Sequence, residues 1–152
     1  MLSLYKNEHG GVVFWMCLMP FLVSSLALII YGGNAYASKA ICRSKLENAL
    51  LNAAILSYPT ASAIDSNAAR PNFELYLQKN LNLNSDFTPK ENSLASGKVT
   101  YSHYRAINTN VSVSDDLIGD NVNKPSLEAE ISVPVMNGYT INVVSRVAVA
   151  PR

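Results

Sequence analysis

Residues 11–31, GVVFWMCLMPFLVSSLALIIY, decide the architecture of this 152-residue chain. No charged side chain occurs in residues 10–38, and two serines, Ser24 and Ser25, are the main polar interruption of the apolar run. Twenty-one residues at a rise of about 1.5 Å each make a helix of about 31 Å, close to the thickness of the hydrocarbon core of a bilayer. A helix in the core of a small soluble domain would carry a polar stripe. The stretch therefore predicts one membrane-spanning helix over residues 11–33.

Four residues characterise this span. Gly11 opens it, and Pro20 is expected to kink it, which neighbouring helices or water tolerate within a membrane. Trp15 and Tyr31 lie near its two ends, where amphipathic rings favour the headgroup region. The chain thus begins with a short polar tail, residues 1–10, followed directly by a membrane helix.

A cleaved signal peptide is the alternative interpretation of the same stretch. Ala35-Tyr36-Ala37 has the small-x-small pattern that signal peptidase recognises, and cleavage after Ala37 would release the rest of the chain. Against this, the apolar run exceeds the usual length of about 7–15 residues. The charge before it is also weak, since Glu8 offsets Lys6. Both interpretations lead the chain to a membrane export route and argue against a cytosolic enzyme.

The remainder of the chain, about 115 residues, suffices for one small domain with its own core. The formal net charge is +1, and no basic patch indicates nucleic acid as a partner. Charge leaves the orientation of the span ambiguous, because one cation, Lys6, precedes it, and Lys39, Arg43 and Lys45 follow it. Read literally, the positive-inside bias places the C-terminal side in the cytoplasm, although that bias weakens for a long folded domain.

The helix is predicted to resume as an amphipathic one over residues 38–57, after the membrane exit and a possible kink at Gly32-Gly33, so that the N-terminal third forms one long helix. Its apolar positions recur at spacings of 4, 3, 4 and 3 residues. We name this set the core stripe; it comprises Cys42, Leu46, Ala49, Ala53 and Leu56. The stripe is expected to pack against a sheet, and the alternative is a coiled-coil contact with another copy.

The two cysteines cannot form a disulfide within one chain. Cys17 and Cys42 lie about 37 Å apart along a continuous helix, whereas a disulfide needs Cα atoms within about 7 Å. Both cysteines are interpreted as small buried apolar residues, and an exposed Cys42 would instead be able to bridge two copies.

The second half of the chain changes from helical to alternating periodicity. Pro71 is expected to open a short helix over 71–81 that places Phe73, Leu77 and Leu81 on one face. Alternation then predicts four strands, at about 98–106, 109–114, 127–135 and 139–149. In the first of these, Tyr101 and Tyr104 are expected on opposite faces. The fold class is therefore α+β, a long N-terminal helix packed on a small antiparallel sheet.

The register of the last hairpin follows from its pattern. A three-residue loop, 136–138, pairs Val135 with Tyr139, and it likewise pairs the next two apolar positions of each strand, which keeps one face dry. It also places Gly138 at the left-handed position that such loops require. A two-residue loop would mix apolar and polar partners on each face.

The sequence shows little sign of catalytic chemistry. The two histidines, His9 and His103, lie on opposite sides of the span, and no common metal-binding, nucleophile or phosphate-loop motif is present. Residues 115–120 hold three aspartates without EF-hand spacing, so a solvated loop is favoured over a calcium site. We therefore expect no enzyme activity, no cofactor, no metal and no small-molecule substrate.

A short tail ending in glycine, an apolar helix that continues as an amphipathic one, and then antiparallel strands make up the layout of a pilin. The stretches HGGVVFWMCLMPFLV and AICRSKLENALLNAAILS, within residues 6–57, resemble the TadE/TadG-like minor pilins or assembly proteins of the tight-adherence (Flp) pilus. That resemblance implies processing near Gly10 or Gly11, in competition with cleavage after Ala37. Substrates of prepilin peptidase usually carry a glutamate five residues after the cleaved glycine, where this chain has Trp15 or Met16.

The missing glutamate makes the uncleaved TadG-like branch the better match, although this chain is too short for the larger domain of that branch. The resemblance implies a single-pass inner-membrane protein with its domain in the periplasm, opposite to the literal charge count. Its expected partners are the membrane and other pilins or pilus assembly subunits, and its expected roles are pilus assembly, adhesion and secretion. The alternative is an adhesive or binding domain released into the periplasm or medium after Ala37.

Overall fold

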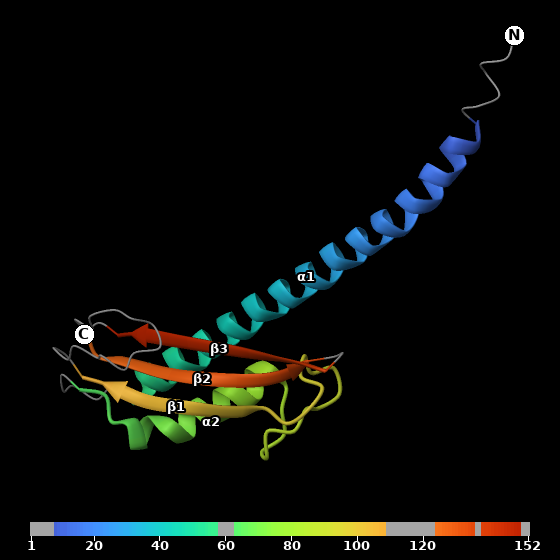
Figure 1. The fold of residues 1–152 in the computed structure, drawn as a ribbon. Helices are drawn as coiled ribbons and strands as arrows, with labels where there is room; N and C mark the ends of the chain where they lie inside the picture. The colour runs from blue at the N-terminus through green and yellow to red at the C-terminus, as the bar shows by residue number, and fades with distance from the viewer. Residues whose placement is uncertain (1–7, 58–62, 109–123, 136–137, 150–152) are drawn as a thin grey trace, which may run out of the picture. The chain divides into compact units, whose positions relative to one another are not determined.

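The computed structural model describes residues 8–57, 63–108, 124–135 and 138–149 (Figure 1). Its elements are α1 (Glu8–Leu56), α2 (Ser66–Leu81), β1 (Thr100–Ile107), β2 (Ser126–Val135) and β3 (Tyr139–Ala148). The predicted α+β class is confirmed: a long N-terminal helix is combined with a small three-stranded antiparallel sheet. The chain divides into two compact units, Met1–Ala37 and Ser38–Arg152, which we describe separately.

Helix α1 is a single element of 49 residues. The prediction of one long helix through Gly32-Gly33 is confirmed, because both glycines are helical. Among the described residues, nothing beyond the helix itself lies within 4 Å of the place that a β-carbon would take at either glycine. The helix ends at Leu56, and the Ser57 amide donates a final hydrogen bond of 3.1 Å to the Ala53 carbonyl.

Helix α2 begins at Ser66, five residues before the predicted start at Pro71. Asp65 caps it, because its carboxylate accepts the Asn67 amide at 2.8 Å. Pro71 therefore lies inside the second turn, where its missing N–H removes one helical hydrogen bond without ending the helix. The helix ends as predicted at Leu81, followed by Asn82 in the left-handed conformation. Its predicted buried face, Phe73, Leu77 and Leu81, is confirmed, and Ala69 extends it by one turn.

The three strands form one antiparallel sheet in the order β1-β2-β3 (Figure 1). The predicted hairpin register is confirmed: Val135 pairs with Tyr139, Val133 with Ile141, and Ile131 with Val143. Gly138 has φ of +77°, the left-handed value that the three-residue loop requires. The fourth predicted strand, 109–114, lies outside the described residues.

Strand β1 departs from the predicted alternation through a β-bulge. Ser102 pairs with Glu130 and Arg105 pairs with Glu128, so that two residues, His103 and Tyr104, lie opposite one residue of β2. His103 adopts a left-handed φ of 50° to make this possible. The extra residue reverses the alternation, and Tyr104 packs against the core on the same side as Tyr101. The prediction that these two tyrosines lie on opposite faces is therefore wrong.

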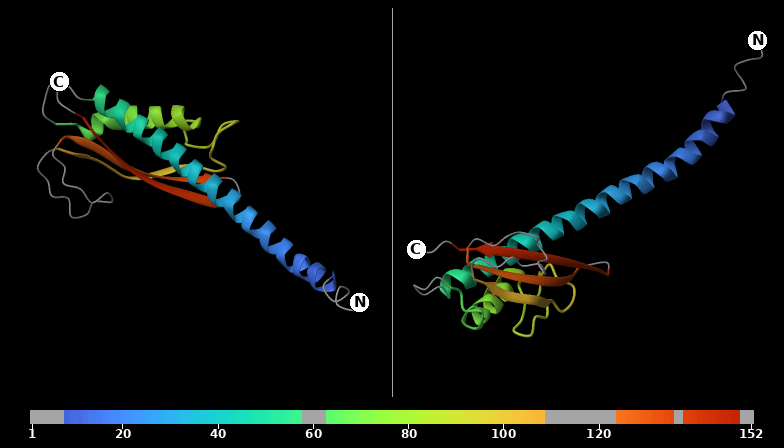
Figure 2. Two further views of the ribbon diagram at one scale, coloured as in Figure 1. Left: turned by 90° about the horizontal axis from the view of Figure 1, so that it is seen from above. Right: turned by 60° about the vertical axis from the view of Figure 1, so that its left-hand side comes forward.

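The core of the second unit lies between the sheet and two helices. Figures 1 and 2 show the C-terminal part of α1 and α2 on the same face of the sheet. A reciprocal pair joins the helices: the Lys45 ammonium donates to the Asn80 carbonyl, and the Asn80 amide donates to the Lys45 carbonyl at 3.1 Å. The Ser145 hydroxyl of β3 donates to the Glu47 carboxylate of α1 at 3.2 Å.

The core stripe is buried at four of its five positions. Cys42, Leu46, Ala49 and Ala53 have no exposed surface, and Leu50 and Ala54 join them. Leu56 is 58% exposed, so its predicted burial is wrong. A 4-3-4-3 spacing averages less than the 3.6 residues of a helical turn, and the stripe therefore drifts around the helix. At the end of α1, Ser57 takes the inward position instead and is 6% exposed.

Candidate functional site

The first unit presents an almost continuous apolar surface. From Gly11 to Tyr31, none of the side chains that the structure describes is buried, and Phe21, Leu28 and Ile29 are at least 70% exposed. The most apolar 18-residue window of α1 has a mean hydropathy of 2.0. Within the described residues, α1 is the one helix long and apolar enough to cross a membrane. An apolar surface of this extent is typical of a helix that contacts lipid or other apolar helices.

The polar groups of this segment are satisfied inside the helix. The Ser24 hydroxyl donates to the Pro20 carbonyl at 2.7 Å, and the Ser25 hydroxyl donates to the Phe21 carbonyl at 2.8 Å. Such back-bonding removes the cost of placing a free hydroxyl in an apolar medium. Pro20 lies within α1, and the predicted end markers Trp15 and Tyr31 are both exposed.

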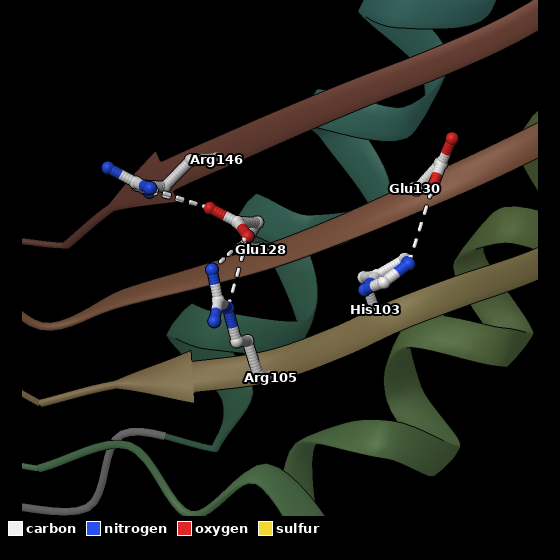
Figure 3. A network of polar contacts seen from close by, with 5 residues as sticks. All are labelled: His103, Arg105, Glu128, Glu130 and Arg146. Carbon is white, nitrogen blue, oxygen red and sulfur yellow. Dashed lines mark hydrogen bonds and ion pairs between the residues drawn. The ribbon is translucent and has the colours of Figure 1, made fainter. Parts of the chain in front are cut away.

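The second unit contains a buried carboxylate held between two arginines (Figure 3). Glu128 is fully buried in β2, and its two cross-strand neighbours are Arg105 of β1 and Arg146 of β3. The Nη2 atom of Arg105 lies 2.9 Å from Glu128 Oε1, and that of Arg146 lies 2.7 Å from Oε2. The Nε atom of each arginine donates to the same oxygen as its Nη2. Each carboxylate oxygen thus accepts two charge-assisted hydrogen bonds, which compensates the burial of the charge.

A second, weaker pair lies further along the same two strands. Figure 3 shows His103 of β1 next to Glu130 of β2. His103 Nε2 lies 3.7 Å from Glu130 Oε2, and the Ser102 hydroxyl donates to the same oxygen at 3.2 Å. The His103 side chain is largely exposed, so we assign this pair little stabilisation. The sheet therefore carries one buried ionic group and one exposed pair on neighbouring rungs.

An aromatic cluster joins α2 to β1. The ring of Phe73 stacks on Tyr104, with ring centroids 4.9 Å apart, and meets Tyr101 edge-on at 5.4 Å. The Arg70 guanidinium lies 5.6 Å from the centre of the Tyr104 ring, and Glu74 accepts the Tyr101 hydroxyl. Burial raises the pKa of Tyr104 to about 12, and burial together with Glu74 raises the pKa of Tyr101. Both tyrosines are therefore neutral packing groups at physiological pH.

The residues predicted to take part in processing, Gly10, Gly11 and Ala37, all lie within α1. Cys42 is buried, whereas Cys17 is exposed on the apolar surface of the first unit, so the predicted burial of Cys17 is wrong; neither forms a disulfide within the described part of the chain. Cys42 is accordingly the small core residue that was predicted, and it is not available to bridge two copies. The three aspartates of residues 115–120 lie outside the described residues. Among the residues that are described, no three histidine, cysteine, aspartate or glutamate side chains gather as metal ligands.

Sequence reasoning missed the ionic group around Glu128. Alternation placed Glu128 on the polar face of its strand and gave no sign that this position is buried. One signal was available in retrospect, because the hairpin register already sets Glu128 opposite Arg146. The sequence could not predict that Arg105 faces Glu128, since the bulge shifts the register of β1 by one residue.

No protein-family model, no curated protein and no solved structure matches this chain.

Proposed function

We propose that the chain is a non-enzymatic, single-span membrane protein that acts as a minor pilin or assembly factor of a tight-adherence pilus. In this proposal residues 11–33 hold the protein in the inner membrane of a bacterium. The second unit lies on the periplasmic side and works through contacts with other pilins or assembly subunits. The resemblance of residues 6–57 to the TadE/TadG-like proteins is the source of the pilus assignment.

One structural observation supports the proposal most strongly. Helix α1 supplies both an apolar segment of membrane-spanning length and the buried stripe of an α+β domain. A soluble protein has no reason to expose Phe21, Leu28 and Ile29 along an uncharged helix, because such a surface promotes aggregation. A protein that joins a bilayer anchor to a folded domain through one helix is suited to presenting that domain to membrane-bound partners.

Gene replacement in the native bacterium tests this function. Deletion of the gene is expected to abolish surface pili and surface adhesion, and the full chain is expected to restore both. A version in which a cleavable signal peptide replaces residues 1–37 exports the same second unit without the anchor. We expect this version to fail, with immunoblotting of periplasmic fractions as the control that the domain is present. Full restoration of pili by the released domain would refute an anchored role.

A secreted or periplasmic adhesive domain is the second candidate, and one observation favours it. The boundary between the two compact units falls between Ala37 and Ser38, which is the position where the Ala35-Tyr36-Ala37 pattern would be cleaved. A released domain would then begin at the start of its own compact unit. In the same deletion strain, restored adhesion without pili on addition of the purified second unit would favour this candidate.

A further inference from the structure

Helix α1 carries a second stripe that the domain core does not use. We name it the outer stripe; it comprises Ile41, Ser44, Asn48, Leu51 and Ile55, at spacings of 3, 4, 3 and 4 residues. All five side chains are exposed, with Ile41 at 45%, Leu51 at 38% and Ile55 at 48%. At 100° per residue the outer stripe is centred opposite the buried side chains of this part of α1, so the sheet and α2 leave it uncovered; the buried set is Cys42, Leu46, Ala49, Leu50, Ala53 and Ala54.

The spacing and the residue types of the outer stripe are those of a two-stranded coiled coil. In heptad notation Ile41, Asn48 and Ile55 occupy a positions, and Ser44 and Leu51 occupy d positions. In parallel coiled coils, β-branched residues at a with leucine at d favour two strands. The stripe itself contains no charge, and the charged side chains of this part of the helix lie beside or behind it.

We propose that the outer stripe binds the outer stripe of a second copy of this chain, with the two helices parallel and in register. The proposal deepens the proposed function and rests on it in one respect. If α1 anchors every copy in one bilayer, all copies enter that bilayer by the same end of the helix, and neighbouring helices run in the same direction. The partner's contact surface is then identical to the one described.

The charges at the two borders of the stripe are compatible with this arrangement. Lys45 occupies an e position on one border and Glu47 a g position on the other. In a parallel pair, each g position faces the e position of the partner's next heptad, so Glu47 comes beside the partner's Asn52 and Lys45 beside the partner's Ala40. The parallel pair therefore sets no like charges against each other across the stripe.

Asn48 fixes the register of the pair. It lies at the central a position, and within the described residues its side chain makes no hydrogen bond. In a parallel, in-register pair, Asn48 meets the asparagine of the partner, and the two amides satisfy each other. A shift by one heptad would bury each asparagine against isoleucine, which costs free energy because the amide is left unpaired.

Cysteine cross-linking of the full-length protein in native membranes tests the proposal. In a Cys17→Ser background, Asn48→Cys and Ile55→Cys are each oxidised with copper phenanthroline. Arg43→Cys is the matched control, because it is exposed on the same helix but lies off the stripe. We expect both stripe variants to form disulfide-linked dimers several-fold more efficiently than the control. An antiparallel pair would cross-link Ile55→Cys only with Ile41→Cys, and that result would overturn the proposal.

A second measurement does not depend on cysteine chemistry. Light scattering of the detergent-extracted protein is expected to give twice the 16.5 kDa mass of the chain. The double variant Leu51→Lys/Ile55→Lys is expected to halve that mass without changing the melting curve, because both side chains are exposed. Leu75→Lys on α2, also exposed, is the control and should remain dimeric.

Three further results would overturn the inference: a monomeric native chain, equal cross-linking at Arg43 and Asn48, or cross-linking of Asn48→Cys solely to a different protein. Carbonate extraction of the same membranes reports the anchor independently. A protein that resists extraction but stays monomeric would refute the paired stripe while leaving the anchored function standing.

Discussion

At the scale of single residues, the burial of a polar side chain in the sheet differs from what its sequence pattern indicates. The sequence pattern places Glu128 on the solvent face of a strand. In the structure it has no exposed surface and lies between two arginines. Alternation reveals the face of a strand on which a residue lies. It does not reveal whether that face is covered, because burial depends on segments far away in the sequence.

Replacement of Glu128 by glutamine is expected to lower the free energy of unfolding by about 3 kcal/mol. The neutral amide keeps the shape but loses the charge-assisted hydrogen bonds that the buried carboxylate accepts from Arg105 and Arg146. Thermal and denaturant unfolding of the full-length protein in detergent measures the change. Glu130→Gln removes the exposed pair with His103 and is the matched control, with an expected cost below about 1 kcal/mol. Equal losses for the two variants would mean that Glu128 is not specially stabilised.

The stability of the domain is expected to fall between pH 10 and pH 12, in part through Tyr104. An unfolded tyrosine loses its proton at about pH 10, whereas burial raises the pKa of Tyr104 to about 12. Below pH 10 both states hold this proton, and above it the unfolded state loses the proton first. The contribution is therefore fully present below pH 10 and is lost as the pH rises through 12. Tyr104→Phe should flatten the curve of unfolding free energy against pH, whereas Tyr139→Phe, at an exposed position, should not.

At the scale of elements, the sequence predicted what local rules determine. Hydrophobic alternation and Gly138 were sufficient for the β2–β3 register, because a slip by one residue would expose the whole apolar face. These local rules did not predict two features. The bulge at His103 arises in pairing with a distant strand, and the helical start at Ser66 depends on a cap at Asp65 that outweighs the proline signal.

Gly138→Val is expected to destabilise the hairpin by about 1 kcal/mol or more, because valine disfavours the left-handed backbone that the turn needs. Apart from its chain neighbours, no atom of the described residues lies within 4 Å of the added β-carbon, so the loss reports backbone strain. Gly138→Asn, which tolerates this conformation better, should cost less in the same unfolding assay. A valine variant as stable as the native chain would contradict the turn geometry.

Leu46→Asp and Leu56→Asp together test which face of α1 joins the domain. Leu46 is fully buried, so an aspartate there places an unpaired charge among apolar side chains and should prevent stable folding of the second unit. Leu56 is 58% exposed, and its substitution should change the free energy of unfolding by less than about 0.5 kcal/mol. Cell abundance and melting curves of both variants measure this contrast. A well-folded Leu46→Asp variant would mean that the core stripe faces solvent.

At the scale of the whole molecule, one helix belongs to two environments. Its N-terminal part exposes apolar side chains along an uncharged surface, and its C-terminal part buries the core stripe in an α+β domain. Composition alone predicted this division, since the charges begin again at Lys39. The continuity of α1 through Gly32-Gly33 was also predicted, and glycine weakens a helix there without requiring that it end.

We expect the N-terminal helix to be retained in the mature protein. The uncharged run exceeds the length of a usual signal peptide, and Trp15 or Met16 stands where a peptidase substrate would carry glutamate. The intact mass of protein extracted from membranes of the native host should therefore be close to 16.5 kDa. An Ala37→Leu variant, which disrupts the small-x-small pattern, should give the same mass and the same resistance to carbonate as the native chain. A mature N-terminus at Ser38 that disappears in this variant would show that signal peptidase releases the domain. A terminus at Gly11 or Val12 would instead show prepilin-type processing, which leaves the apolar helix and the anchored model in place.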